Sequence, residues 1–448
     1  MTSRTDGAST ALLTDHYEFT ALDAARRSGI AEHRATFELF ARSLPVGRRY
    51  GVVAGMARAV EAVERFRFDE ADIEWLRRRA FVSPSTIDWL AEFRFRGDLV
   101  GYPDGELYFP NSPILTVDAT FGEALVLETV LLSILNHDCA VASAAARMDV
   151  AAGSRSTIEG GARRTHEAAA VDASLAAYVA GIDVTSNLEA GRRYGLPTAG
   201  TTMHAFTLAH RSEADAFAAQ VAAFGPSSTF LVDTYDIEVG IRTAVEVAGP
   251  GIGAVRIDSG DISEEARRAR MLLDELGATG CRVIASGDLD EFRLVELADA
   301  PVDAYLLGTR LVTGSGAPTA ELVYKLVAVA DGATADAAMR PVAKTSRGKG
   351  HLGGRKVATR VFDGDGLAVE ERVVGSAADL PPLRADHFER RLQVPLMSGG
   401  VPTRSFSADS ARAHHLTVRS ELPERALHID PGPAHLDAAR PPRRHVID

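Results

Sequence analysis

Four short apolar runs, separated by helical patterns, restrict the fold of this chain more than any other feature of its sequence. The runs cover residues 229–232, 254–257, 282–285 and 304–307. Strands that alternate with helices on this spacing run parallel, in either a barrel or a doubly wound sheet. A doubly wound dinucleotide-binding fold would carry a glycine fingerprint and then an acidic residue at a strand end, and the sequence lacks this pattern. We therefore expect an irregular α/β barrel.

Small or acidic residues directly follow three of these runs. They are Asp258-Ser259-Gly260-Asp261, Ser286-Gly287 and Gly308-Thr309. Parallel strands bring their carboxyl ends to one rim, where backbone N–H groups and carboxylates can meet a phosphorylated ligand. The stretch 200–206 precedes the last three runs and contributes Thr201 and His204. The sequence thus predicts one phosphate-binding site at this rim.

The predicted secondary structure before and after the barrel segment differs from that of the barrel. Residues 1–120 mix amphipathic helices with alternating strand patterns, which predicts a mixed α+β domain. Residues 121–335 should form the barrel, with a soft linker at 331–339, and residues 336–448 should pack back on the first domain. Finer expectations are helices over 123–135, 140–148 and 386–393, a strand over 197–201, and a proline-rich tail from Pro431 that wraps over the surface or frays.

Composition excludes several classes of function. The formal net charge of -12 disfavours nucleic acid or an anionic membrane as the main partner. The two cysteines, Cys139 and Cys281, cannot form a disulfide framework and fit a reducing compartment. Residues 1–9 carry no apolar signal segment, and apolar runs such as 124–135 are interrupted by Glu128 and too short to span a bilayer. We expect a soluble, cytoplasmic protein that binds neither nucleic acid nor membrane.

Several motifs coincide, in order, with those of one enzyme family. They are Phe37-Glu38-Leu39-Phe40 with Leu44-Pro45, Glu128-Thr129 with Asn136, Ala177-Tyr178 with Thr185-Ser186-Asn187, Gly200-Thr201 with His204, Arg256 with Asp258-Ser259-Gly260-Asp261, Gly308-Thr309, and Val323-Tyr324-Lys325-Leu326. Between about residue 11 and about residue 360 the chain resembles the nicotinate phosphoribosyltransferases.

This resemblance implies a type II phosphoribosyltransferase fold, with an irregular α/β barrel beside a mixed α+β domain built from both chain ends. It also implies a homodimer with shared active sites. The implied reaction joins nicotinate to 5-phosphoribosyl 1-pyrophosphate, giving nicotinate mononucleotide and pyrophosphate in NAD salvage. ATP is the implied co-substrate, hydrolysed to ADP and phosphate through a phosphohistidine. Mg²⁺ is the implied cofactor, and the sequence assigns no ligand to it.

The resemblance matches His204 to the histidine that ATP phosphorylates. A neutral imidazole nitrogen is a competent phosphoryl acceptor near neutral pH. Arg256 and Asp258 leave one strand two residues apart, so their side chains share a face. Arg256 can lie against a pyridine ring or bind a carboxylate, and Asp258 can hold ribose hydroxyls or Mg²⁺ bound to pyrophosphate. A structural ion pair between these two residues is the alternative.

The phosphate groups of the substrate are assigned to several other residues, Arg163 by the resemblance and the strand ends because loops there commonly bind phosphate through backbone N–H groups. Arg163 matches an arginine that faces the substrate phosphates. The 5′-phosphate of the sugar is assigned to the two strand ends 286–287 and 308–309, and Ser259 and Gly260 also belong to the binding set. The phosphate-binding candidates are thus Arg163, Ser259, Gly260, Ser286, Gly287, Gly308 and Thr309.

The nicotinate ring is assigned to a third group of residues. Gly160 stands where nicotinamide-using relatives carry an aromatic residue, so ring stacking is assigned to Tyr17, reaching in from the second subunit. Thr201 and Ser186 place hydroxyls near the base pocket. Nicotinamide-using relatives carry an aspartate near the position of Ser186, and a carboxylate there would repel nicotinate, so serine favours the acid substrate.

Three other aspartates, Asp233, Asp236 and Asp261, follow strands. Asp233 and Asp236 could bind Mg²⁺ or polar substrate groups, and helix capping explains each of the three equally well.

Two other interpretations of the function of the whole chain stay open. One is a transferase of the same fold that uses quinolinate or nicotinamide, and the other is a non-catalytic metabolite sensor that has kept the pocket. The intact set of His204, Arg256 and Asp258 speaks against the sensor.

Overall fold

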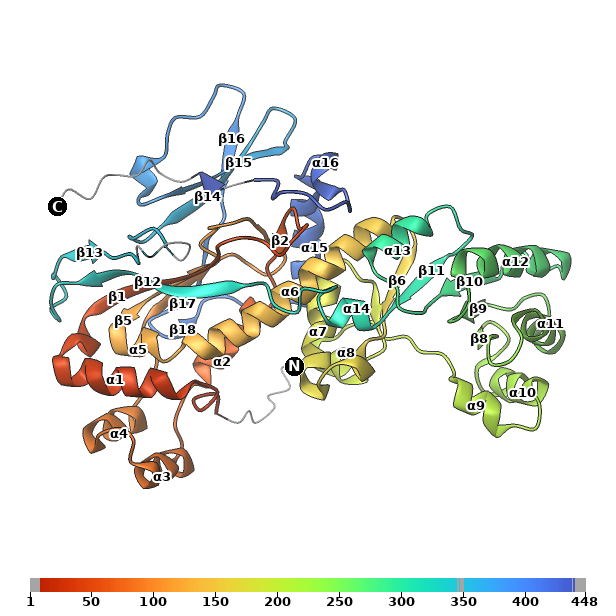
Figure 1. Cartoon of the computed structure of the whole chain (residues 1–448), viewed down its shortest axis with the longest axis horizontal. Helices are drawn as coiled ribbons and strands as arrows, with labels where there is room; N and C mark the ends of the chain where they lie inside the picture. Colours follow the sequence, from red (N-terminus) through yellow and green to blue (C-terminus); the bar gives the residue numbers. More distant parts are fainter. Residues whose placement is uncertain (1–8, 345, 347–349, 437, 440–448) are drawn as a thin grey trace. The chain divides into compact units, whose positions relative to one another are not determined.

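The computed structural model, shown in Figure 1, describes residues 9–344, 346, 350–436 and 438–439 of the 448-residue chain. Its contacts divide the chain into two compact units. The first comprises Met1–Ala140 and Thr319–Asp448, so it draws on both ends of the chain, and the second comprises Val141–Pro318. One boundary between the units falls inside α6 (Glu128–Ala152).

A seven-stranded antiparallel sheet forms the centre of the first unit. In spatial order its strands are β13 (Met339–Pro341), β12 (Leu322–Ala330), β1 (Arg34–Ala41), β5 (Leu115–Thr120), β3 (Asp98–Gly101), β17 (Val394–Ser398) and β18 (Val401–Pro402). The strand predicted from residue 34 is confirmed as β1, which pairs with β12 and β5. Because side chains alternate along a strand, Ala35, Phe37 and Leu39 share one face, and all three lie in the apolar core.

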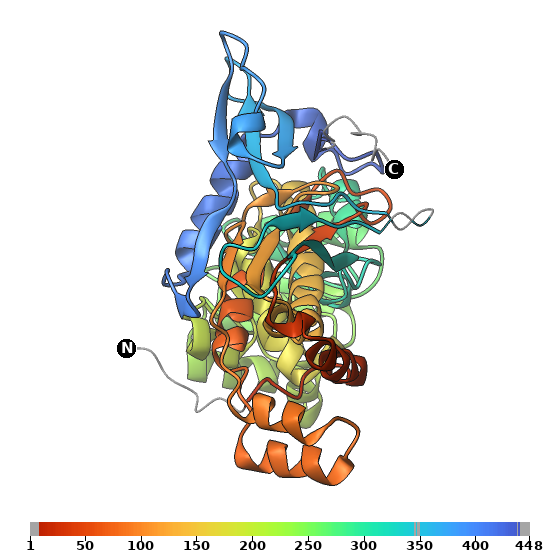
Figure 2. The same cartoon turned by 90° about the vertical axis from the view of Figure 1, so that its left-hand side faces the viewer.

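Helices pack on this core. Those of the first unit are α1 (His16–Ser28), η1 (Ile30–Glu32), α2 (Met56–Glu64), α3 (Glu70–Arg79), α4 (Pro84–Ala91), α5 (Phe121–Leu125), η3 (Ala377–Asp379), α15 (Ala408–Ser420) and α16 (Glu424–Leu427). Phe19 and Leu22 of α1 and Met56 and Ala59 of α2 are buried in the same cluster as β1. The two views in Figures 1 and 2 show α3 and α4, in orange, side by side as a helical hairpin.

Two smaller sheets complete the first unit. A four-stranded sheet has the order β16 (Phe388–Arg391), β14 (Val357–Phe362), β15 (Ala368–Val374) and β19 (Ala438–Ala439), and a two-stranded sheet pairs β2 (Gly51–Val52) with β4 (Leu107–Tyr108). Arg360 of β14 is fully buried and donates to Glu106 Oε1 and Glu371 Oε2, each at 2.7 Å. Burial by itself would raise the pKa of Glu106, but the charge of Arg360, together with the contacts of His414 and Arg390, holds the pKa of that carboxyl below its usual range. These charges tie β14 and β15 to the residues that precede β4.

The second unit is a curled parallel sheet flanked by helices. Its six strands stand in the order β7 (Val184–Thr185), β6 (Ser156–Glu159), β11 (Ala304–Leu307), β10 (Arg282–Ala285), β9 (Ala254–Ile257) and β8 (Thr229–Leu231). Every pairing is parallel, so the predicted α/β class is confirmed as a half-barrel. Within the described residues β7 and β8 do not pair, and the chain that joins them carries His204.

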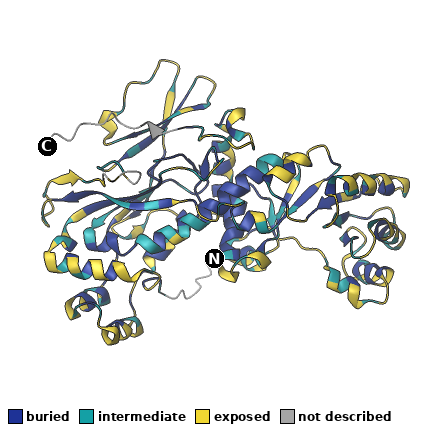
Figure 3. Cartoon of the chain, in the orientation of Figure 1, coloured by how far each residue is buried: buried dark blue, intermediate teal, exposed yellow. Residues whose placement is uncertain are grey.

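The helices of the second unit follow the predicted alternation with strands. They are η2 (Ala162–Arg164), α7 (Glu167–Val179), α8 (Leu188–Tyr194), α9 (His204–Ala209), α10 (Glu213–Phe224), α11 (Ile237–Ala248), α12 (Ile262–Glu275), α13 (Glu291–Glu296) and α14 (Thr309–Val312). α12 buries Ile262, Ala266, Ala269 and Leu273, which lie on one face at helical spacing. Its outer side is exposed, yellow in Figure 3.

The predicted break between helices at 136–139 is wrong, because α6 continues through it. The polar residues at this point of the helix have partners in the first unit. Asn136 Oδ1 accepts from the Leu322 N–H at 2.8 Å, and Asp138 pairs with Arg58 at 2.6 Å.

By length and composition α6 is the one described helix that could cross a membrane. However, 67% of its most apolar stretch is buried inside the protein, as in the core helix of a soluble protein.

Two other local predictions are corrected. Residues predicted as a helix over 386–393 contain β16, because β14 offers an antiparallel partner and the Phe388 ring stacks on Phe362 with centroids 4.9 Å apart. The strand predicted over 197–201 is reduced to one bridge between Thr185 and Thr198. The tail predicted from residue 431 lies partly outside the described residues.

The buried charges predict a large loss of stability when one partner is removed. Glu371→Ala leaves the Arg360 guanidinium without one of its two carboxylates inside the protein, which should lower the free energy of unfolding by about 3 kcal/mol. The neighbouring Glu370→Ala is the control, since Glu370 forms a partly exposed pair with Arg372 at 2.9 Å and should cost about 1 kcal/mol or less. Denaturant unfolding measures both values, and equal losses would contradict the assignment.

Candidate active site

The carboxyl ends of four neighbouring strands meet at one rim of the second unit. In the parallel register, Leu231 of β8 lies beside Arg256 of β9, and Ile257 of β9 lies beside Ala285 of β10. The residues that follow these strands therefore emerge next to one another. They are Asp233-Thr234 after β8, Asp258-Ser259-Gly260 after β9, Ser286-Gly287 after β10 and Gly308-Thr309 after β11.

His204, the first residue of α9, lies beside this rim. Its Nδ1 is 3.2 Å from Thr234 Oγ1, and its Nε2 is 3.9 Å from Asp233 Oδ1. The side chain is 41% exposed, so a ligand can reach the ring. The polar contacts distinguish it from a histidine packed in the core, which is the ordinary alternative for a single histidine.

Asp233 joins the ends of two strands. Its Oδ2 accepts from the Asp258 N–H and from Ser259 Oγ, both at 2.9 Å. The side chain is only 2% exposed, and its other oxygen, Oδ1, is buried without a hydrogen-bond donor. A carboxylate oxygen in this state is costly unless a ligand or a proton satisfies it. Asp233 therefore belongs to the site and caps no helix.

For Asp236 and Asp261 the capping alternative holds. Asp236 is the N-cap of α11 and accepts from the Val239 N–H at 3.0 Å. Asp261 is the N-cap of α12 and accepts from the Ser263 N–H at 3.1 Å. Both carboxylates thus satisfy backbone donors at helix starts, as short acidic side chains commonly do.

Arg256 connects the rim to the segment before His204. Its Nη1 donates to Thr201 Oγ1 at 2.8 Å, while its Nη2 is 3.9 Å from Asp258 Oδ2. The longer contact is an ion pair without a hydrogen bond, so it leaves both groups able to bind a ligand. The Nε atom of Arg256 is buried and has no acceptor.

The strand ends predicted to bind phosphate have tight backbone geometry. Gly287 has a φ of +101°, and a Cβ there would lie 2.7 Å from the Asp258 carbonyl oxygen, so only glycine fits. Ser286 is fully buried, and its N–H and Oγ both donate to the Ile257 carbonyl, at 2.9 and 3.2 Å. At this strand end, donors for a phosphate would therefore come from Gly287 onward.

A glycine-rich loop places Arg163 near the end of β11. The Gly160 N–H donates to the Leu307 carbonyl at 2.7 Å, and a Cβ on Gly161 would lie 3.0 Å from the Gly308 carbonyl oxygen. This loop and the strand end 308–309 therefore pack together. Among the described residues, the exposed Arg163 side chain has no hydrogen-bond or ion-pair partner.

Two other predicted residues, Ser186 and Tyr17, are placed by contacts within their own units. Ser186 is exposed and its N–H donates to the Glu159 carbonyl at 2.8 Å. Tyr17 lies on α1 in the first unit, where it is half-exposed. Burial, and then the charge of Glu128, raise the pKa of the Tyr17 phenol above its usual range. The ligand contacts of Ser186 and Tyr17 stay predictions.

Two residues of the site were not found from the sequence. Thr234 follows Asp233, and the same strand-end pattern that selected its neighbours could have indicated it. Gln220 lies in the middle of α10 and carries no such signal. Its Oε1 accepts from Thr202 Oγ1 at 3.2 Å and its Nε2 donates to the Thr229 carbonyl at 2.8 Å, so it fixes the segment before His204 to β8.

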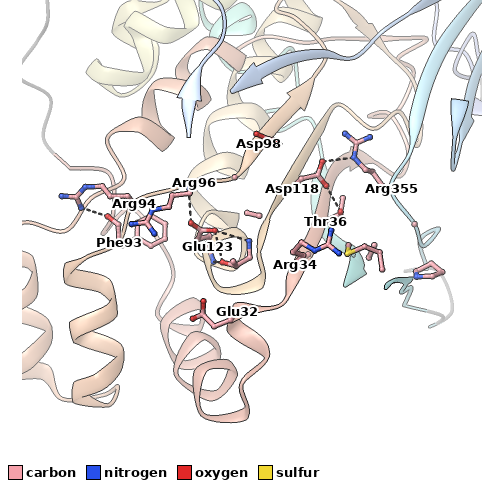
Figure 4. Close-up of a pocket in the computed structure, with 18 of the residues that line it drawn as sticks. Glu32, Arg34, Thr36, Phe93, Arg94, Arg96, Asp98, Asp118, Glu123 and Arg355 are labelled. Carbon is pink, nitrogen blue, oxygen red and sulfur yellow. Dashed lines mark hydrogen bonds and ion pairs between the residues drawn. The ribbon is translucent and has the colours of Figure 1, made fainter. Parts of the chain in front are cut away.

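A cavity of about 990 Å³ in the first unit is the alternative location for a site (Figure 4). Its carboxylates Asp118 and Glu123 already accept hydrogen bonds from neighbouring residues. Asp118 accepts from Arg355 Nε at 2.8 Å and from Thr36 Oγ1 at 2.7 Å, and Glu123 accepts from the Arg96 N–H at 3.2 Å. No described polar side-chain atom buried in its lining lacks a partner. The rim of the second unit, with its unpaired buried oxygen, is the stronger candidate.

Within the described part of the chain, no group of three or more His, Cys, Asp and Glu side chains could hold a metal ion unaided. The rim instead presents separate carboxylates, among which Asp258 is partly exposed and accepts no hydrogen bond from a described side chain.

Comparison with known proteins adds a separate line of evidence. Residues 12–136 match the family model of the nicotinate phosphoribosyltransferase (NAPRTase) N-terminal domain. The chain is 52% identical over 429 residues to the nicotinate phosphoribosyltransferase pncB1 of Mycobacterium tuberculosis, covering 94% of this chain and 93% of that relative. It is 38% identical over 330 residues to the nicotinate phosphoribosyltransferase of Bacillus subtilis, covering 72% and 67%. The fold resembles the crystal structure of human nicotinic acid phosphoribosyltransferase, with a TM-score of 0.80, 24% identity, and coverage of 95% and 97%.

The contacts of Asp233 predict a local effect of its removal. Asp233→Ala takes away the acceptor of the Asp258 N–H, so amide hydrogen exchange at residue 258 should accelerate by about tenfold or more. Asp236→Ala is the control, because it should affect the start of α11 and leave residue 258 unchanged. Exchange measured by NMR or mass spectrometry distinguishes the two, and unchanged exchange in Asp233→Ala would contradict the bridging role.

Proposed function

The chain belongs to the nicotinate phosphoribosyltransferase family, and we propose that it transfers the phosphoribosyl group of 5-phosphoribosyl 1-pyrophosphate to nicotinate in NAD salvage. The products are nicotinate mononucleotide and pyrophosphate. The observation that carries this proposal is the meeting of His204, Asp233, Arg256 and Asp258 at one rim. The enzyme works in the cytoplasm as a homodimer with shared active sites, in which the half-exposed Tyr17 stacks on the ring bound by the partner subunit.

The transfer step exchanges two bonds at C1 of the ribose. The bond from C1 to the pyrophosphate oxygen lengthens first, and positive charge develops on the sugar. The pyridine nitrogen then forms the new bond from the opposite side, and the electron pair of the broken bond leaves with pyrophosphate. Arg163 binds the phosphate groups, Arg256 contacts the nicotinate, and the hydroxyl of Thr201 is held beside it. The protein acts mainly by positioning and by matching charge.

His204 carries the coupling to ATP. Its imidazole is exposed, and a hydrogen bond from Nε2–H to the unsatisfied Oδ1 of Asp233 would leave Nδ1 unprotonated as the nucleophile. Nδ1 forms a bond to the γ-phosphorus of ATP while the bond to the ADP oxygen breaks. Water later hydrolyses the phosphohistidine to free phosphate and histidine. The charge of the phosphoryl group beside the rim promotes substrate binding and transfer.

Mg²⁺ fits the oxygen groups at the rim. Asp258 is partly exposed, lies 3.9 Å from Arg256 Nη2 and accepts no hydrogen bond from a described side chain, so it can offer a carboxylate oxygen. Mg²⁺ is commonly held by one or two carboxylates together with substrate phosphates and water. Asp258 would hold the ion with pyrophosphate oxygens as the other ligands, and the ion would supply positive charge for the leaving group.

Phosphate labelling tests the role of His204. Incubation with γ-labelled ATP should transfer label to the wild-type protein but not to His204→Ala, because the nucleophilic nitrogen is gone. His210→Ala is the control, since His210 ends the same helix and contacts the Phe206 carbonyl at 2.8 Å. Product formation by His204→Ala that responds to ATP as in the wild type would exclude the proposed phosphoenzyme.

Substrate selectivity tests the transfer itself. The wild-type protein should use nicotinate in preference to nicotinamide and quinolinate, and Arg256→Ala should lower kcat/KM for nicotinate by ~10²-fold through loss of a charge-assisted contact. Arg267→Ala, on the exposed side of α12, is the control and should leave kcat/KM unchanged. Preference for quinolinate would favour the decarboxylating relative, and binding of nicotinate without any turnover would favour a sensor.

A further inference from the structure

Glu159, the last residue of β6, is a buried acidic residue that none of the steps above uses. It is 1% exposed and lies at the carboxyl end of its strand. Two loops start beside it: residues 160–166, which carry Arg163, and residues 185–187, which carry Ser186. Among the described residues no cation pairs with the Glu159 carboxylate, and its hydrogen bonds run to these two loops and to α7.

One carboxylate oxygen holds the first loop. Glu159 Oε1 accepts from the Gly161 N–H at 2.5 Å. On the other side, a Cβ on Gly161 would lie 2.3 Å from Val312 Cγ1, so the backbone already lies close to α14. Gly161, which precedes η2, is therefore held between the Glu159 carboxylate and Val312 of α14. The backbone of Arg163, two residues further along, starts from that position.

The other oxygen holds the second loop. Glu159 Oε2 accepts from Thr185 Oγ1 at 2.5 Å and from Ser174 Oγ of α7 at 2.9 Å. Thr185 Oγ1 in turn accepts from the Asn187 N–H at 3.0 Å. The Glu159 backbone carbonyl also accepts from the Ser186 N–H at 2.8 Å. Side chain and main chain of one residue thus fix residues 185–187.

A carboxylate is the side chain best suited to these contacts. It accepts on both oxygens, whereas glutamine would present an NH₂ group to one of the two loops. To contact that NH₂ group, the hydroxyls of Ser174 and Thr185 would have to turn their protons away and accept, so neither would still donate to residue 159. A buried carboxylate without a cation is costly, and the Gly161 N–H and the Thr185 hydroxyl offset that cost here. Ser174 Oγ lies 2.9 Å from both Glu159 Oε2 and the Ala170 carbonyl, so its one proton is shared between them.

We propose that Glu159 is a positioning residue for phosphoribosyl transfer, which holds loops 160–166 and 185–187 at a fixed spacing so that Arg163 and Ser186 meet the substrate together. Glu159 itself does not touch the substrate and acts through Arg163 and Ser186. This inference rests on the proposed function and adds to it a residue outside the set around His204.

Steady-state kinetics on the full chain tests the inference. Glu159→Gln should raise KM for 5-phosphoribosyl 1-pyrophosphate by about tenfold or more, with a smaller change in kcat, because a substrate-facing arginine is no longer held in place. Glu159→Asp keeps the charge but shortens the side chain, so it should raise KM by less. An unchanged KM in a folded Glu159→Gln protein would overturn the inference; if that protein does not fold, an unchanged KM in Glu159→Asp would do so.

Asp183→Asn is the matched control. Asp183 also accepts from a backbone N–H, that of Thr157 at 3.0 Å, but at the opposite end of the same strand pair. It should lower the unfolding temperature as much as Glu159→Gln does, and yet leave KM within about twofold of the wild type. An equal rise of KM in both variants would mean a general loss of stability and would overturn the positioning role.

A double-mutant cycle separates positioning from structure. In an Arg163→Ala background, Glu159→Gln should raise KM further by less than about twofold, because its effect passes through the missing side chain. If the two substitutions raised KM independently, so that their effects on its free energy added in full, the positioning role would be contradicted. The wild-type protein distinguishes the two levels of inference: no turnover of nicotinate would reject the proposed function, whereas normal turnover with an unaffected Glu159→Gln would reject only the role of Glu159.

Discussion

The parallel register of β8, β9 and β10 is the constraint on which the site depends. Backbone hydrogen bonds continue this register one step past the strands, from the Val232 N–H to the Arg256 carbonyl at 3.4 Å and from the Ser286 N–H to the Ile257 carbonyl at 2.9 Å. The loops therefore leave the sheet in fixed relative positions. Asp233 can bridge to residues 258–259 only because β8 and β9 end together. A shift of one residue in either strand would turn these side chains away from the rim.

His204 is held in a different way, because its segment belongs to no strand. Three side-chain contacts secure it: Thr201 with Arg256, Thr202 with Gln220, and His204 with Thr234. Side-chain contacts of this kind are individually weak. The histidine thus lies beside a rigid rim on a segment that the ladder of the sheet does not fix, and its exposed ring can be reached by a phosphate donor.

Negative charge is concentrated around this histidine. Asp233 has a buried oxygen without a donor, and Glu213, at the start of α10, has a buried oxygen in the same state. Burial, and then the charges of Asp233 and Asp236, raise the pKa of Glu213 above its usual range. Such an arrangement favours cationic groups at the rim, and Arg256 is one of them.

The sequence by itself determined the features that depend on local periodicity. Strand–helix alternation predicted a parallel α/β barrel, and the small and acidic residues after the strands, Asp258 among them, marked its rim. His204 and Arg256 were indicated by the motifs that resemble the family. Tertiary structure alone decided which acid caps a helix and which joins the site, because Asp233, Asp236 and Asp261 follow strands in similar ways and differ only in the donors that distant residues bring to them. It also decided that α6 continues through Asn136, whose partners lie beyond residue 318, and that Glu159 joins two loops. Contacts between residues far apart in the chain satisfy these buried polar groups, and no local pattern records them.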